Sequence, residues 1–263
     1  MVFGFLIISF CAAVLEMLPI SSSTHIAVLT NVLQNYGVFA YDNELLKALD
    51  FLLHGPMVIV LIIFFFNRWR LLPRFFLKNR YSFLNYLICG FIAEFVTLMF
   101  FIFFEYSGMS GWPRWLGFLL TALALLSDRL LGAQEQSTQW NKINAFILGV
   151  AQGIAFLPGV SRFGLTFAAA RWRGFSLRHA LELSFLIEFP ISCAATLKGF
   201  YDMHKLHALN LLNWQWQLTM VIAIVVAVAL LFLVRKIIMA RKWWLFGWYA
   251  AILSAVSLLN GHA

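Results

Sequence analysis

The chain has 263 residues, of which 62% are hydrophobic and only 11% are charged. Soluble globular proteins carry roughly a quarter charged residues, so this composition, with a mean hydropathy of +0.85, excludes an ordinary soluble domain. The formal net charge of +8 does not indicate a nucleic-acid partner, because the basic residues stand in short clusters between apolar runs, as in loops that set membrane topology.

Six apolar runs follow one another along the chain, at residues 51–67, 82–104, 115–131, 180–200, 216–234 and 243–260. Runs of about 17–25 residues are long enough to cross a bilayer as helices. Because these runs are continuously apolar rather than alternating, they predict spanning helices and not the strands of a barrel.

Two further apolar stretches, residues 2–35 and 143–172, are each interrupted by a proline followed by small polar residues. Pro19 and Pro158 cannot continue an ordinary helix. Broken backbone at membrane depth is tolerated only where it is buried in protein or lines a wet cavity. We therefore expect two re-entrant helical hairpins, which with the six spans make an all-α polytopic membrane protein.

The charges predict on which side each loop lies. Three basic clusters, placed in the cytoplasm, agree with this layout: Arg68, Arg70, Arg74, Lys78 and Arg80; Arg171, Arg173 and Arg178; Arg235, Lys236, Arg241 and Lys242. The opposite loops carry acidic residues: Asp42, Glu44, Asp50, Glu105 and Asp202.

The layout also predicts an internal repeat within a single membrane domain of residues 1–263. Residues 1–133 and residues 134–263 each contain one hairpin followed by three spans. An odd number of spans makes the second unit enter from the opposite side, which is an inverted-topology repeat. Such repeats place a binding site near the midplane, where the two units meet.

Polar side chains concentrate at the two interruptions. An ionisable side chain at the centre of a membrane helix costs at least about 2.5–3.5 kcal/mol, so each needs a partner or a function. If the two hairpin tips met, they would gather one polar set: Glu16, Ser21, Ser22, Ser23, His25, Ser161 and Arg162. The alternative for the serines is close helix packing. The alternative for Glu94, Glu182 and Glu188 is a structural role, in which they pair with Arg162 or with one another.

The chemistry of this set suits a phosphate group. An arginine matches phosphate oxygens bidentately, and serine- or glycine-containing turns at helix N-termini bind anions. A carboxylate can hold a divalent cation that bridges phosphate oxygens, and a histidine can act as acid, base or nucleophile. The substrate expected for such a set in a membrane protein is a lipid phosphate.

Three motifs carry a resemblance to a known family. "EMLPISSSTH" at residues 16–25 and "AQGIAFLPGVSRFGLT" at 151–166 resemble the two signatures of the undecaprenyl-diphosphate phosphatase family of the bacitracin-resistance type. "ALELSFLIEFP" at 180–190 is similar to a third segment of that family. The likeness runs over most of the chain in order and spacing.

The resemblance implies a multi-pass enzyme of the bacterial inner (cytoplasmic) membrane. It would hydrolyse undecaprenyl diphosphate, a polyprenyl diphosphate lipid, to undecaprenyl phosphate and inorganic phosphate, with its site open to the outer side. This activity would recycle the lipid carrier of cell-wall synthesis. The family also implies a divalent cation, Mg or Ca, and leaves a homodimer open.

The resemblance assigns roles by position. Glu16 would help to hold the cation. The catalytic groups at the reacting phosphate would be Glu16, Ser21, Ser22, His25, Ser161 and Arg162, with Ser161 and Arg162 stabilising the developing charge. Further contacts to substrate would come from Ser23, Gln152, Gly159 and Thr166. Whether the histidine, a serine or a water attacks the phosphorus stays open.

One position departs from the family pattern. Four residues before Glu16, where the family carries a second acidic residue, this chain has Ala12. Glu188 is the candidate for a compensating metal ligand. The alternative function is a transporter or flippase of polyprenyl phosphate lipids, because inverted repeats with broken helices are also typical of transporters. Ala12 favours that alternative, whereas Glu16 and His25 favour the enzyme.

Overall fold

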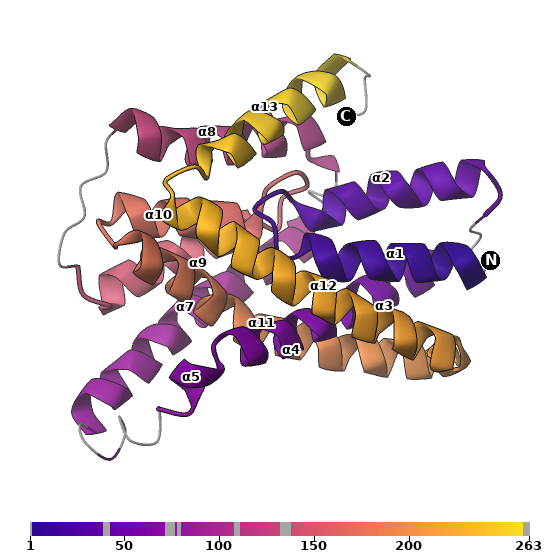
Figure 1. Ribbon diagram of the computed structural model, residues 1–263, viewed down its shortest axis with the longest axis horizontal. Coiled ribbons are helices and arrows are strands. Elements are labelled where there is room, and N and C mark those ends of the chain that lie inside the picture. Colours follow the sequence, from indigo (N-terminus) through magenta and orange to yellow (C-terminus); the bar gives the residue numbers. More distant parts are fainter. Residues whose placement is uncertain are drawn as a thin grey trace. The chain divides into compact units, whose positions relative to one another are not determined.

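The computed structural model describes residues 2–38, 43–71, 77, 80–107, 111–131 and 138–259. Throughout these residues the regular secondary structure is helical (Figure 1). The helices are α1 (Val2–Leu15), α2 (Ser22–Asn35), α3 (Asn43–Leu52), α4 (His54–Phe64), α5 (Phe66–Trp69), α7 (Arg80–Ser107), α8 (Arg114–Leu131), α9 (Lys142–Ile154), α10 (Arg162–Trp172), α11 (Leu177–Lys205), the 3-10 helix η2 (Leu209–Leu211), α12 (Trp214–Met239) and α13 (Trp244–Leu259). Asp42, Arg74 and Lys78 of the predicted loops lie outside the described residues.

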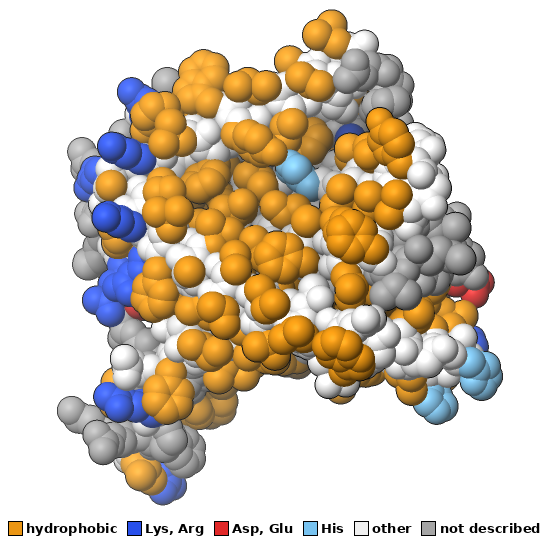
Figure 2. Space-filling view, turned by 45° about the vertical axis from the view of Figure 1, so that its right-hand side comes forward, with side chains coloured by type: hydrophobic (Ala, Val, Ile, Leu, Met, Phe, Trp, Pro, Cys, Tyr) orange, Lys and Arg blue, Asp and Glu red, His pale blue; other side chains and the backbone are white. Residues whose placement is uncertain are grey.

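The part of the chain that the structure describes contains four helical segments long and apolar enough to cross a membrane: Glu44–Phe64, Arg80–Ser107, Leu177–Lys205 and Trp214–Met239. Large apolar side chains are exposed on them, among them Phe91 and Phe95 of α7 and Val221 and Val225 of α12. Figure 2 shows how widely such side chains cover one face of the molecule. Soluble monomers rarely expose apolar patches of this extent, so the chain is an all-α, multi-pass membrane protein.

The expected spans at 115–131 and 243–260 form shorter apolar helices. Their apolar parts are Arg114–Ser127 of α8 and Trp244–Leu259 of α13. At 1.5 Å per residue these segments are about 21–24 Å long, which is less than the hydrocarbon core of about 30 Å. The exact count of six spans stays a prediction.

The span expected at 51–67 begins earlier than predicted and is interrupted. It consists of α3 and α4, which are separated at Leu53. Pro56 lies in the first turn of α4, where it cannot donate to the carbonyl of Leu52 and its ring crowds that carbonyl. The helix therefore ends at Leu52 and begins again at His54.

Both proline interruptions of the two hairpins are confirmed. Pro19 lies in the break between α1 and α2, at residues 16–21, and Pro158 lies in the break between α9 and α10, at residues 155–161. In each pair the two helices pack against each other. Figure 1 shows α1 and α2 side by side.

The chain forms two compact units. Unit 1 contains Met1–Leu18, Ser22–Phe65 and Phe189–Val234, and unit 2 contains Pro19–Ser21, Phe66–Glu188 and Arg235–Ala263. Each unit therefore combines segments from both halves of the sequence. The tip of the first hairpin, Pro19–Ser21, belongs to unit 2 although the segments on either side of it belong to unit 1. The inverted repeat of residues 1–133 and 134–263 stays a prediction.

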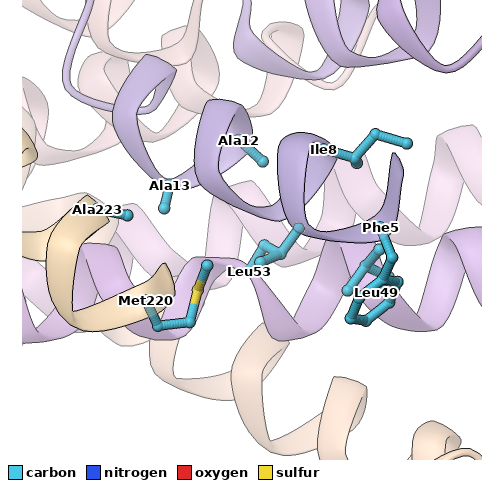
Figure 3. Packing of buried hydrophobic residues seen from close by; sticks show 8 residues of the cluster. All are labelled: Phe5, Ile8, Ala12, Ala13, Leu49, Leu53, Met220 and Ala223. Atoms are coloured by element: carbon cyan, nitrogen blue, oxygen red, sulfur yellow. The ribbon is translucent and has the colours of Figure 1, made fainter. Parts of the chain in front are cut away.

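In unit 1, an apolar cluster holds α1 against α3 and α12 (Figure 3). Its buried members are Phe5, Ile8, Ala12, Ala13, Leu49, Leu53, Met220 and Ala223. The four residues from α1 recur at the spacing of one helix face. Beside the cluster, Trp216 Nε1 of α12 donates to Ser9 Oγ of α1 over 3.2 Å.

In unit 2, α8 packs against α13 and α7 packs against α9. The hydroxyl of Thr97 on α7 donates to the carbonyl oxygen of Gly149 on α9 over 3.2 Å. A Cβ atom on Gly149 would lie only 2.5 Å from the carbonyl oxygen of Ala93. The two helices approach closely because a glycine stands at the contact, as is common between membrane helices.

Candidate functional site

The first polar segment of the predicted site stands where α1 ends and α2 begins, and except for Pro19–Ser21 it belongs to unit 1. Glu16 is the first residue after α1, and Ser22 is the first residue of α2. The hydroxyl of Ser22 donates a hydrogen bond to Glu16 Oε1 over 2.8 Å. His25 follows Ser22 by three positions in the helix, so the two side chains share a helix face. A carboxylate, a hydroxyl and an imidazole are thus grouped at the N-terminus of α2.

The serines on either side of Ser22 have different surroundings. Ser21 has a φ of 42°, in the left-handed region that non-glycine residues seldom adopt, and it is only 4% exposed. Strained backbone of this kind concentrates at functional segments. Ser23 is exposed, and its contact with substrate stays a prediction.

The second polar segment begins α10 in unit 2. Ser161 caps this helix, because its Oγ accepts a hydrogen bond from the Gly164 N–H over 3.1 Å. Arg162 is the first residue of α10, and its side chain is 21% exposed. The N-terminus of a helix carries partial positive charge and favours anions. The guanidinium group of Arg162 adds a full positive charge at that end.

Helix α8 holds this second segment in place, a role that sequence analysis missed. Thr121 Oγ1 accepts a hydrogen bond from the Ser161 N–H over 2.9 Å and donates to the Gly159 carbonyl over 3.3 Å. A Cβ atom on Gly117 would lie 2.0 Å from the Pro158 carbonyl oxygen. Gly117 and Thr121 stand four residues apart on one face of α8. Two small residues at this spacing in an apolar helix are the sequence feature from which a close backbone contact could have been predicted.

Gly159 is required by the shape of the break itself. Its φ is 86°, a conformation that glycine adopts readily and other residues adopt at a cost. A Cβ atom at this position would also lie 2.2 Å from the Arg114 carbonyl oxygen at the start of α8. The structure therefore explains Gly159 through backbone geometry, and its contact with substrate stays a prediction.

Arg162 lies beside two acidic residues, Glu188, which is buried, and Glu94, which is partly buried. Its Nη1 atom is 3.4 Å from Glu188 Oε1 of α11, and the Glu188 side chain is 2% exposed. Glu94 of α7 interacts electrostatically with both residues. The ring of Phe156 lies below the guanidinium group, 5.6 Å from its central carbon. Pairing between Glu188 and Arg162, one of the two roles considered for this glutamate, is thus what the structure shows.

Gln152 and Thr166 are buried and bonded to protein groups. The Gln152 amide nitrogen donates to the Ile187 carbonyl over 3.0 Å, and its oxygen accepts from the Thr97 hydroxyl over 3.4 Å. Thr166 Oγ1 donates to the Arg162 carbonyl over 2.8 Å. Both residues support the elements that carry Arg162 and Glu188, and direct contact with substrate stays a prediction for each.

The tip of the first hairpin packs against the start of α10 within unit 2. A Cβ atom on Gly164 would lie 3.4 Å from the Pro19 carbonyl oxygen and 3.1 Å from Ser161 Oγ. The segment Pro19–Ser21 therefore adjoins the turn that presents Ser161 and Arg162. Of the predicted site residues, unit 2 contains Ser21, Gln152, Gly159, Ser161, Arg162, Thr166 and Glu188, and unit 1 contains Glu16, Ser22, Ser23 and His25.

The donor atoms available to a metal ion are few. Among the described residues, no three His, Cys, Asp or Glu side chains gather as metal ligands. Ala12 is 5% exposed and belongs to the apolar cluster on α1. Mg²⁺ uses one or two carboxylates and otherwise binds water and phosphate oxygens, and the carboxylate of Glu16 is the candidate at the first polar segment.

Comparison with known proteins identifies the family. The family model described as bacitracin resistance protein BacA matches residues 5–256. A protein named undecaprenyl-diphosphatase from Carboxydothermus hydrogenoformans is 34% identical over 77% of this chain and 76% of its own length. Proteins of the same name from Halothermothrix orenii and Methanococcus maripaludis are 31% and 28% identical, over 71% and 95% of this chain and 70% and 96% of their own lengths. The chain belongs to the BacA family.

Proposed function

We propose that this protein is an undecaprenyl-diphosphatase, which hydrolyses undecaprenyl diphosphate to undecaprenyl phosphate and inorganic phosphate. The observation that supports the proposal is the Ser161–Arg162 turn at the start of α10, where an arginine stands at the capped N-terminus of a helix, in a membrane protein of this family. The relatives at 26–34% identity that bear this name support the same activity.

Arg162 binds the terminal phosphate in this proposal. The arginine fork matches phosphate oxygens bidentately and stays charged at any physiological pH. Backbone N–H groups and the dipole of α10 add to the positive potential at the same place. Charge developing on the phosphoryl oxygens in the transition state is stabilised by groups that are already oriented, which is the largest contribution in many enzymes.

The pair of Glu16 and Ser22 performs the proton transfer. A carboxylate that accepts the hydroxyl proton at 2.8 Å has the geometry of a general base next to a nucleophile. Ser22 then either attacks phosphorus itself or orients a water that attacks. His25, on the same helix face, supplies the proton to the leaving phosphate oxygen. A phosphoserine trapped by rapid acid quench distinguishes attack by Ser22 from attack by water.

The divalent cation is part of the same proposal. Glu16 is the one predicted ligand whose carboxylate stands at the first polar segment, and the diphosphate and water would supply the other oxygens. The cation, Mg²⁺ or Ca²⁺, would neutralise charge on the diphosphate.

We further propose six spans, two re-entrant hairpins and an inverted repeat, in the bacterial inner membrane with the site facing outward. Equivalent contacts in the two units support the repeat. In unit 1 the first hairpin helix, α1, packs on α3 and α12. In unit 2 the corresponding helix, α9, packs on α7 and bonds to α11. A homodimer also remains a proposal.

The alternative function, transport of polyprenyl phosphate lipids, is not favoured by the relatives, which are named as diphosphatases. Phosphate release from undecaprenyl diphosphate by the purified protein in detergent, with Mg²⁺, Ca²⁺ or EDTA, separates the two functions. Release should depend on the cation and be lost in Arg162→Ala. Arg178→Ala is the matched control, because Arg178 pairs with Glu182 on the exposed part of α11. Lipid binding that depends on Arg162, without release under any condition, would instead favour the transporter.

A further inference from the structure

We propose that Glu188 is an internal counter-ion of Arg162, which orients the guanidinium group and weakens the hold of the site on product phosphate. The inference rests on the proposed function, in that Arg162 is taken to bind phosphate. It gives Glu188 a positioning role in place of the metal-binding role considered from the sequence.

The position of Glu188 is fixed by the protein around it. Its neighbour in α11, Ile187, accepts the Gln152 amide hydrogen bond over 3.0 Å, and Gln152 is in turn bonded to Thr97 of α7. Pro190 removes the donor that would serve the Leu186 carbonyl, and the Gln152 bond is made to the next carbonyl of α11. Glu188 is thus fixed in a buried position, 2% exposed, beside Arg162.

The contact between the two side chains is loose. Their Nη1–Oε1 distance is 3.4 Å, whereas charge-assisted hydrogen bonds of this type are usually about 2.7–2.9 Å. The Arg162 side chain also keeps 21% of its surface exposed. A guanidinium group held at this distance is oriented by Glu188 but can still turn toward a stronger anion. Compared with the Glu188 carboxylate at 3.4 Å, a phosphate group carries more negative charge and can match the guanidinium group with better geometry.

The local charge also opposes tight phosphate binding. Glu188 is buried and holds its carboxylate 3.4 Å from the guanidinium group of Arg162. Negative charge on the protein side of the guanidinium lowers the potential felt by an incoming phosphate. In the partly desolvated interior such an effect is about tenfold in affinity for one unit charge. An enzyme whose product is inorganic phosphate gains turnover when that product is released quickly.

The test uses purified full-length protein in detergent and inorganic phosphate as the probe. Glu188→Gln keeps the size and the hydrogen-bonding atoms but removes the charge. It should bind inorganic phosphate about tenfold more tightly by calorimetry, and the inhibition constant of phosphate in the hydrolysis assay should fall equally. KM for the lipid should fall with it, and kcat should fall because product leaves more slowly. Glu188→Asp should restore values near those of the wild type.

Two further variants keep the test decisive. Glu188→Leu, which also removes the charge, should tighten phosphate binding in the same direction, and it serves if Glu188→Gln fails to fold. Glu182→Gln, on the same helix but paired with Arg178, should leave phosphate binding and KM unchanged. Phosphate binding that is unchanged or weaker in a folded Glu188→Gln protein overturns the inference. A raised Mg²⁺ requirement with unchanged phosphate affinity would do the same, in favour of a metal ligand. If the wild type releases no phosphate from lipid, the proposed function fails, while calorimetry still tests Glu188.

Discussion

Replacing Gly117 by alanine tests how helix α8 supports the active-site turn. Alanine is favoured over glycine inside a helix by about 1 kcal/mol, so in isolation the change would stabilise α8. In the folded protein the new Cβ would lie 2.0 Å from the Pro158 carbonyl oxygen and 2.7 Å from two backbone atoms of Gly159. These obstacles are backbone atoms, which cannot rotate away as a side chain can.

The structure sets the size of the expected loss. Moving from 2.0 Å to an ordinary contact of 3.4 Å displaces the break from α8 by about 1.4 Å. The displacement breaks the 2.9 Å hydrogen bond from the Ser161 N–H to Thr121 and weakens that from Thr121 to Gly159. Overpacking costs about 1–3 kcal/mol and each hydrogen bond about 1 kcal/mol. After the gain in helix propensity, the free energy of unfolding should fall by about 2–4 kcal/mol.

Thermal unfolding in detergent and phosphate release measure the two consequences. The loss corresponds to a decrease in Tm of roughly 4–16 °C, and displacing Arg162 by about 1 Å should slow hydrolysis about 100-fold. Gly90→Ala is the control, because a Cβ on Gly90 of α7 meets nothing within 4 Å, and this variant should be as stable as the wild type or slightly more so. If Gly117→Ala behaves like Gly90→Ala in both assays, the reasoning about α8 is refuted.

Further substitutions address the site. Ser22→Ala and Glu16→Gln should each lower the rate of phosphate release by about 10²–10⁴-fold. If the two groups act as a pair, the double variant should be little slower than either single variant. Additive losses would contradict that pairing. Thr121→Val should lower the free energy of unfolding by about 1–3 kcal/mol, seen as a lower Tm, because it leaves the buried Ser161 N–H without its acceptor; an unchanged Tm would argue against this bond. Ala12→Glu should destabilise the protein, since the carboxylate would enter the apolar cluster on α1, and it should not lower the Mg²⁺ concentration needed for half-maximal release. A lower requirement would instead show that the position can serve as a metal ligand.

Much of the fold could be predicted from local sequence. A proline followed by small polar residues in an apolar run is a local feature, and Pro19 and Pro158 do interrupt the helices as expected. The continuous apolar runs likewise predicted helices that match α7, α11 and α12. The span expected at 51–67 is present but runs over Glu44–Phe64, and its division into α3 and α4 at Pro56 was not predicted from the sequence.

The contacts that hold the site residues in place could not be predicted from local sequence. Gly117 and Thr121 support the site through contacts with residues about forty positions later in the chain. The sequence of α8 alone does not indicate which backbone segment packs against these small residues. Glu188 could be recognised as costly in a membrane helix, but its partner could not be chosen, because Arg162 and a metal ion are equally suitable partners for a carboxylate. The positions of Gln152 and Thr166 in the protein interior also depend on tertiary packing.

The packing of Pro19–Ser21 within unit 2 has a consequence for the folding of the chain during its synthesis. The Pro19 carbonyl lies against Gly164. The tip of the first hairpin therefore lacks this packing partner until 145 further residues have been synthesised. At about 5–20 residues per second this delay is roughly 7–30 s. During that interval the earliest polar segment of the nascent chain is inserted beside lipid or translocon without the partner that later covers it. The turn that starts α10 therefore completes the packing of a segment made much earlier, so substitutions in this turn should affect maturation of the protein as well as its site.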